Sequence, residues 1–263
     1  MGFTPFTEKH AIQEVAFVLT FARPFSTANM EALTKAHDAI SGELPRLERG
    51  TVIQFDFVGH DQREAPPPPV SIQSYKRDGS LDWRVFASDN YIAVNCLSYS
   101  RWDLVYKQAR RYLNWARSTL SNLNVSGFGL QYIDTFRYNG DVSEYSAFDL
   151  IRRDSGLVPG KFDPRSPFWH LHVGHRSACE AIKGNLLRRL HMDAMEVDQE
   201  FVVRIDSTYL FELVPAMPGG WAYIDGVQDE SFRMAHDLNK QDLREVLIPE
   251  MVLSISLDGG DGE

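Results

Sequence analysis

Three successive segments in the second half of the chain alternate strictly between polar and apolar residues. They read Trp169–Val173 (WHLHV), Leu190–Ala194 (LHMDA) and Val203–Ser207 (VRIDS). Alternation with a period of two is typical of strands that bury one face and expose the other to water. Three such strands in a row predict an antiparallel meander, with turns at Lys183-Gly184 and Asp198-Gln199, whose polar face carries histidine and aspartate.

The first half of the chain contains a second meander and two helical patterns. Asp78-Gly79 and Asp89-Asn90 supply tight turns between its strands, and Ser100 with Asp103 forms a predicted capping box at the start of a helix. A turn at Asp89-Asn90 pairs Val85 with Val94, Ala87 with Ile92 and Trp83 with Cys96. The elements expected in this half are strands at 12–21, 51–58, 70–75, 81–87, 91–98 and 127–138, and helices at about 27–44 and 101–120.

Residues 141–167 form a less regular stretch that contains Pro159-Gly160, and it is the best candidate for a boundary. The sequence therefore predicts an N-terminal half at 1–140, a connector at 141–167 and a C-terminal half at 168–257. A helix at about 230–247, stopped by Pro249, and a last strand at 251–257 complete the second half. Residues 258–263 (DGGDGE) are expected to be a frayed acidic tail.

These elements predict an α+β fold of two similar halves, each a curved antiparallel sheet packed on long helices in a helix-grip-like arrangement. A weak repeat supports the two halves, because Ala36-His-Asp38 in the first helix recurs as Ala235-His-Asp237 in the last. Coincidence is the alternative explanation. Neighbouring residues of a helix point in different directions, so each His-Asp pair is expected to serve packing and not catalysis.

Charge and composition narrow the classes of partner. The net charge of −9 disfavours binding to a nucleic-acid backbone. No apolar segment approaches the length of a membrane span, and the start of the chain lacks a signal pattern, so a cytoplasmic location without membrane contact is expected. Cys96 and Cys179 lie in predicted strands, where Cys96 is expected to be a buried thiol, and their redox state stays open.

The register of the C-terminal meander brings its ionisable residues together. Pairing Leu171 with Met192 and Val173 with Leu190 sets apolar residues opposite one another. The same register places polar side chains in two rows on the other face, where they form the candidate ligand-binding set: His172, His191 and Asp206 in one row, and His170, Asp193 and Arg204 in the other.

Three interpretations of this polar face remain open. His172, His191 and Asp206 could hold Zn²⁺ or a similar ion, because cross-strand neighbours lie about 5 Å apart at their β-carbons. They could also act as an acid–base pair, with Asp206 orienting His191. The third interpretation is the ordinary solvated side of a sheet, on which Asp193 and Arg204 form a simple ion pair.

Known catalytic and cofactor motifs are missing from the sequence. It contains no Gly-x-Gly-x-x-Gly, no Walker loop, no Gly-x-Ser-x-Gly and no His-Glu-x-x-His. No catalytic residue and no cofactor is therefore assigned.

Several segments carry a family resemblance. They are Asp82–Tyr91 (DWRVFASDNY), Tyr99–Trp102 (YSRW), the opening from Pro5 to Phe21, and the late Ala235-His-Asp237. Together they resemble a sporadically distributed, largely uncharacterised bacterial family of proteins of about 260 residues. The resemblance implies an association with mobile phage-defence or toxin–antitoxin loci. It identifies no active-site residue.

The leading hypothesis is a non-enzymatic binding or sensing protein, an accessory of a phage-defence or toxin–antitoxin system with a protein partner or a small ligand. Its support is the absence of a catalytic set together with an aromatic content of 12%. The alternative is a metal-assisted hydrolase that uses His172, His191 and Asp206. If the protein forms an oligomer, a homodimer is the expected form.

Overall fold

The computed structural model describes residues 2–50, 67–158, 162–220 and 223–257 of the chain. Its helices are α1 Thr27–Lys35, α2 Trp102–Thr119, α3 Tyr223–Val246 and α4 Pro249–Ser254. Its strands are β1 Gly2–Pro5, β2 Ile12–Phe21, β3 Arg46–Arg49, β4 Val70–Tyr75, β5 Leu81–Ser88, β6 Tyr91–Cys96, β7 Asn124–Asn139, β8 Trp169–Cys179, β9 Gly184–Val197 and β10 Glu200–Pro218.

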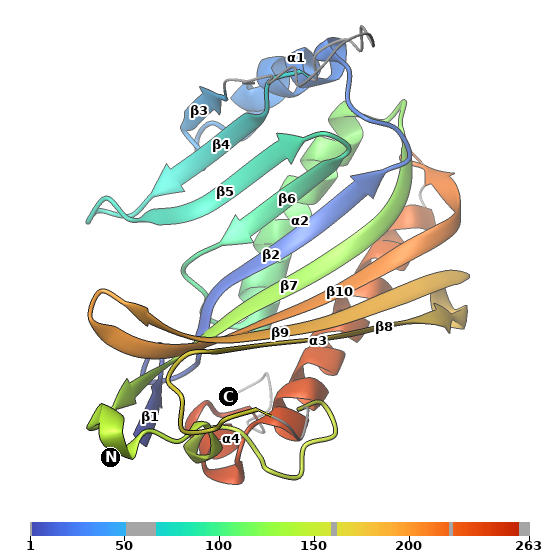
Figure 1. Ribbon diagram of the computed structural model, residues 1–263. Coiled ribbons are helices and arrows are strands. Elements are labelled where there is room, and N and C mark those ends of the chain that lie inside the picture. Colours follow the sequence, from blue (N-terminus) through green and yellow to red (C-terminus); the bar gives the residue numbers. More distant parts are fainter. Residues whose placement is uncertain (1, 51–66, 159–161, 221–222, 258–263) are drawn as a thin grey trace, which may run out of the picture.

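Within the described residues, these strands form one ten-stranded sheet in the order β3-β4-β5-β6-β2-β7-β10-β9-β8, with β1 paired to β7. The neighbouring strands pair in the antiparallel direction. Figure 1 shows a strongly curved sheet with α2 and α3 lying across the same face. The predicted α+β class with a large antiparallel sheet is therefore confirmed.

The strand predictions of the first half agree closely with the structure. β2 has the predicted bounds, and β5 pairs with β6 so that Trp83 faces Cys96, Val85 faces Val94 and Ala87 faces Ile92, as expected. Cys96 and Cys179 are buried free thiols, and burial raises the pKa of Cys96 to about 11. The strand expected at 51–58 and the tail at 258–263 lie outside the described residues.

Both predicted N-terminal helices needed correction at their ends. α1 stops at Lys35 and continues only as a 3-10 turn over Ala36–Ala39. The capping box at Ser100 is wrong: α2 begins at Trp102 with Arg101 as its N-cap residue. Nε of Arg101 lies 3.3 Å from Oδ1 of Asp103, so Asp103 forms an exposed ion pair and does not cap the helix.

The chain end also differs from its prediction. α3 begins at Tyr223, about two turns earlier than expected. The strand predicted at 251–257 is wrong, because Pro249 starts the helix α4. Proline fits the first turn of a helix, where its missing N–H has no partner in any case. Met251, Val252 and Ile255 are buried at spacings of one and four residues, which suit one face of a helix.

Strands from the two predicted halves join in the middle of the sheet. β7 pairs with β2 on one side and with β10 on the other. Two separate sheets are therefore not confirmed. Residues 142–144 and 147–149 of the predicted connector form short 3-10 turns, and Tyr145, Leu150 and Ile151 are buried.

The sheet has an inner face, covered by α2 and α3, and an outer face without these helices (Figure 1). The inner face carries two clusters of buried apolar residues. The first contains Phe17, Tyr112 and Phe232 and lies under α2 and the first part of α3. The second contains Phe136, Met192 and Leu243 and lies under the end of α3 and under α4.

Gly127 on β7 has no room for a side chain. A β-carbon there would lie 2.3 Å from the carbonyl oxygen of Phe211 and 3.0 Å from Oγ1 of Thr20, on the two neighbouring strands. We expect Gly127→Ala to lower the free energy of unfolding by about 1–3 kcal/mol, as other overpacked substitutions do. Urea denaturation measures the change.

Gly226 provides the matched control for this substitution. It lies in α3, where an added β-carbon meets nothing within 4 Å. Gly226→Ala is therefore expected to raise the free energy of unfolding by up to about 1 kcal/mol, because alanine favours helix. A Gly127→Ala variant as stable as the wild-type protein would contradict the close packing at β7.

Candidate functional site

The polar rows predicted on the C-terminal meander exist with the predicted register. β8 and β9 pair so that Leu171 faces Met192, His170 faces Asp193 and His172 faces His191. β9 and β10 pair so that Asp206 faces His191 and Arg204 faces Asp193. Leu171 and Met192 are buried on the inner face, so the polar residues of alternate parity lie on the outer face.

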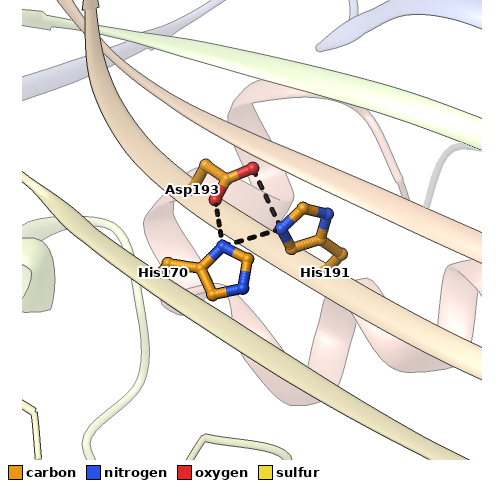
Figure 2. A group of neighbouring side chains, drawn as sticks. All are labelled: His170, His191 and Asp193. Carbon is orange, nitrogen blue, oxygen red and sulfur yellow. Dashed lines mark hydrogen bonds and ion pairs between the residues drawn. The ribbon is translucent and has the colours of Figure 1, made fainter.

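Three of these side chains converge, as Figure 2 shows. Nδ1 of His170 lies 2.7 Å from Oδ1 of Asp193, and Nε2 of His191 lies 3.1 Å from Oδ2 of the same carboxylate. The two ring nitrogens are 3.0 Å apart. We call these three residues the His170–His191–Asp193 triad.

The other predicted site residues lie beside this triad with different partners. The amide of Gln131 on β7 donates to both carboxylate oxygens of Asp206, at 2.9 and 2.8 Å. His172 stacks on His191 with ring centroids 5.6 Å apart and planes inclined by 30°. Arg204 keeps its predicted place opposite Asp193. The set expected for a metal ion, His172, His191 and Asp206, thus shares only His191 with the triad that converges.

A second candidate site is a cavity of about 530 Å³ on the inner face. It lies between β2, β7, the start of α2 and the last part of α3, where the two apolar clusters meet. We call it the helix–sheet pocket. Its lining among the described residues is Lys9, His10, Ala11, Ile12, Tyr99, Ser100, Arg101, Trp102, Tyr132, Asp134, His236, Asn239, Lys240, Leu243, Ile255, Ser256 and Leu257.

Asp134 is the most unusual side chain of the helix–sheet pocket. It lies on β7 opposite Ile12, next to a register shift of β2 between Ile12 and Glu14, and it is 1% exposed. Burial raises the pKa of Asp134 to about 7, because a charged carboxylate is poorly solvated there. Its Oδ2 has no hydrogen-bond partner in the described part of the chain. Buried polar atoms without a partner are rare in native proteins.

Aromatic groups and a second buried amide surround Asp134. His236 of α3 stacks flat on Trp102 with centroids 4.1 Å apart, and its Nδ1 lies 2.8 Å from the hydroxyl of Tyr132. Asn239, one turn further along α3, is 2% exposed. The Oδ1 atom of Asn239 has no partner among the residues that the structure describes. The pocket therefore combines a flat aromatic wall with polar groups that accept hydrogen bonds.

The charges in the pocket lining differ from those of the whole chain. Lys9, Arg101 and Lys240 bring positively charged groups to the lining, and Arg101 also pairs with Asp103, whereas the chain as a whole carries −9. Asp134 is the sole carboxylate among the described lining residues, and its raised pKa reduces its charge near neutral pH. His10 lies 3.1 Å from the carbonyl oxygen of Tyr99, and burial lowers its pKa. The pocket thus favours a negatively charged group.

Sequence reasoning missed this pocket, although it contained one signal for it. On β7 the inner positions Leu130, Tyr132, Asp134 and Phe136 alternate with outer ones, and all four are buried. A single carboxylate among inward apolar residues marks a buried charge, which is uncommon without a function or a partner. His236, which the sequence predicts to pack a helix on the sheet, contacts Trp102 of α2 and Tyr132 of β7 and also lines the pocket.

No known protein-family model matches this chain, and no curated protein matches it. The resemblance to a sporadically distributed bacterial family therefore stays a prediction. No helix in the described parts of the chain is long and apolar enough to span a membrane.

Proposed function

We propose that this protein is a non-enzymatic binding protein that holds a small organic anion in the helix–sheet pocket. The observation that carries the proposal is Asp134, buried at the wall of a 530 Å³ cavity with an unpartnered Oδ2 among the described residues. A volume of a few hundred cubic ångströms is typical of pockets for small molecules. A ligand that donates an N–H or O–H to Asp134 removes the cost of the unpartnered oxygen.

The lining sets further requirements for the ligand. Trp102 and Tyr99 offer aromatic surface for a flat ring system, and Leu243 and Ile255 offer apolar contact. The positive side chains Lys9, Arg101 and Lys240 suit a phosphate or carboxylate group. A ligand with a hydrogen-bonding ring and one anionic group, such as a mononucleotide or an aromatic carboxylate, satisfies these requirements together.

The broader context of this proposal comes from the sequence. A helix-grip-like arrangement of two related halves suits a ligand held between sheet and helices, and α2 and α3 lie on the same face of the sheet (Figure 1). A sensing role, in which ligand binding changes contact with a protein partner, follows from the same proposal. Its setting in phage defence or a toxin–antitoxin system rests on the resemblance alone.

Thermal denaturation with defined probes tests the proposal. We expect at least one probe among purine mononucleotides, pyrimidine mononucleotides and aromatic carboxylates, each at 1 mM as an order-of-magnitude dose, to raise the melting temperature. Ser100→Trp places an indole in the lining and is expected to abolish the shift. Asp134→Asn is expected to weaken binding about tenfold, in the range of one lost charge-assisted hydrogen bond.

The control for Ser100→Trp is Ser80→Trp, in an exposed turn between β4 and β5. This variant is expected to keep the full shift. A panel without any effect on the wild-type protein would overturn the proposal, and so would a shift that Ser100→Trp leaves intact. Turnover of a bound probe by the purified protein would contradict its non-enzymatic part.

A further inference from the structure

The His170–His191–Asp193 triad lies on the outer face, away from the helix–sheet pocket, and the binding proposal does not involve it. Nδ1 of His170 lies 2.7 Å from Oδ1 of Asp193, Nε2 of His191 lies 3.1 Å from Oδ2 of the same carboxylate, and the two ring nitrogens are 3.0 Å apart. One ligand atom from each of the three residues lies within 4.8 Å of the other two. Side chains from two strands thus point at one position.

Hydrogen bonds to Asp193 do not account for the short distance between the two imidazoles. A ring nitrogen has a single in-plane direction, which holds either a proton or a lone pair. When both nitrogens are protonated, each can donate to its own oxygen of Asp193, at 2.7 and 3.1 Å, but the two N–H groups then lie 3.0 Å apart with no acceptor between them. A cation between the three side chains accepts a lone pair from each imidazole and from the carboxylate. The nitrogen–nitrogen distance therefore favours metal ligation.

The spacing of the side chains also fits a metal ion. Zinc lies about 2.0–2.2 Å from imidazole nitrogen and carboxylate oxygen, so two ligand atoms of a tetrahedral zinc ion lie about 3.4 Å apart. The distances of 2.7, 3.1 and 3.0 Å between the three side chains are close to this value. Two nitrogen ligands and one oxygen ligand suit first-row transition-metal dications, whereas Mg²⁺ and Ca²⁺ prefer sets made of oxygen.

The strands hold the triad in place before any ion binds. His191 and Asp193 are two residues apart on β9, and His170 faces Asp193 across the β8–β9 pair. The ring of His172 lies beside His191, with centroids 5.6 Å apart, and does not belong to the three ligand residues. The side chain of His170 is 64% exposed, so water can reach the remaining coordination positions.

We propose that His170, His191 and Asp193 form a binding site for a divalent transition-metal ion of the zinc class, with its open coordination positions toward solvent on the outer face of the sheet. This site differs from the row His172, His191 and Asp206, because Gln131 holds the carboxylate of Asp206. Arg204 faces Asp193 from β10 and places a positive charge near the ion, which weakens its binding.

Isothermal titration of the untagged, chelator-treated protein with ZnCl₂ tests the site, with Co²⁺ absorption as a second readout of ligand geometry. We expect one bound Zn²⁺ per chain and no binding of Mg²⁺. His170→Ala and Asp193→Ala are each expected to weaken the affinity for Zn²⁺ at least tenfold. Arg204→Ala is expected to strengthen it, because the nearby positive charge is removed.

His172→Ala and Asp206→Ala are the matched controls, since His172 lies on β8 like His170, Asp206 lies opposite His191 on the neighbouring β10, and both are on the same face. Both are expected to change the affinity for Zn²⁺ by less than threefold. The proposal is overturned when the wild-type protein binds no Zn²⁺. It is equally overturned when the two controls lose binding and His170→Ala keeps it. Circular dichroism of each variant separates loss of ligation from loss of fold.

Discussion

Asp242→Ala is expected to lower the free energy of unfolding by about 3–5 kcal/mol, the range for a buried ion pair that loses one partner. Asp242 on α3 is 7% exposed. Its carboxylate forms an ion pair with Arg188 of β9 and accepts a hydrogen bond of 2.6 Å from the hydroxyl of Tyr209 on β10. These contacts tie the end of α3 to two strands of the sheet.

The expected loss of stability is large because Asp242→Ala removes the partner of two largely buried polar groups, those of Arg188 and Tyr209. The side chain of Arg188 is only 25% exposed, and Tyr209 is fully buried. Burial, together with the charge of Asp242, raises the pKa of Tyr209 far above its usual value, so its hydroxyl stays protonated and needs an acceptor. Without Asp242, a guanidinium and a phenol remain inside the protein with fewer partners.

Two variants make this first prediction specific. Asp237→Ala, at an exposed position of the same helix, is expected to change the free energy of unfolding by less than about 0.5 kcal/mol. Arg188→Met in the Asp242→Ala background removes the stranded charge and is expected to restore part of the lost stability. Chemical denaturation measures all three. An Asp242→Ala variant within about 1 kcal/mol of wild type would contradict the prediction.

The stability of the ligand-free protein is expected to fall as pH rises from about 4 to 7, with Asp134 as the cause. The carboxyl of Asp134 has its usual pKa of 3.8 when unfolded and a pKa of about 7 in the folded protein, through burial. Between these values the folded state binds more protons than the unfolded state. The free energy of unfolding therefore decreases as pH rises.

The expected magnitude is about 4 kcal/mol, from roughly three pKa units at about 1.4 kcal/mol each. Asp134 is 1% exposed, so screening by solvent does not reduce this figure substantially. Asp134→Asn carries no titrating group, and we expect it to lose this part of the pH dependence and to be more stable than wild type at pH 8. Urea denaturation at pH 4.5, 6 and 8 measures the difference.

Asp38→Asn is the control for the pH series. Asp38 lies in the 3-10 turn that follows α1, outside the helix–sheet pocket, and its substitution should leave the wild-type slope unchanged. The comparison between wild type and variant isolates Asp134 from the other acidic residues of the chain. Parallel curves for wild type and Asp134→Asn would show that Asp134 titrates normally.

Strand register was the feature of this fold that the sequence predicted best. In the pair β5–β6, and where Trp169–Val173 of β8 pairs with Leu190–Ala194 of β9, every second residue is apolar, and a slip by one position would turn those residues to the other face. In the turns Asp89-Asn90 and Asp198-Gln199, both aspartates have a left-handed backbone, which Asp accepts more readily than most residues. Local pattern and turn chemistry therefore agree at these positions.

The ends of the helices and the secondary structure of Met251–Leu257 were predicted less well from the sequence. Met251–Leu257 contains an alternation that fits a strand, but in the structure Pro249 opens a helix there. That choice depends on whether a sheet edge or a helix-packing surface lies nearby, which is not a local property. The start of α2 also differs from its prediction: Arg101, and not Ser100, is the N-cap residue, and Trp102 packs against Tyr106 and His236.

The amino-acid sequence by itself determined the mixed fold, the strand pairs of both meanders and the gathering of histidine and aspartate on one face, because side-chain period and turn residues act over short distances. The tertiary structure decided which of those side chains converge. Asp206 accepts hydrogen bonds from Gln131 of β7, whereas Asp193 contacts the imidazoles of His170 and His191. The tertiary structure also created the helix–sheet pocket, whose walls come from β2, β7, α2 and α3. These residues are far apart in the chain and come together only when the helices pack on the sheet. A pattern of neighbouring residues cannot predict such a long-range contact.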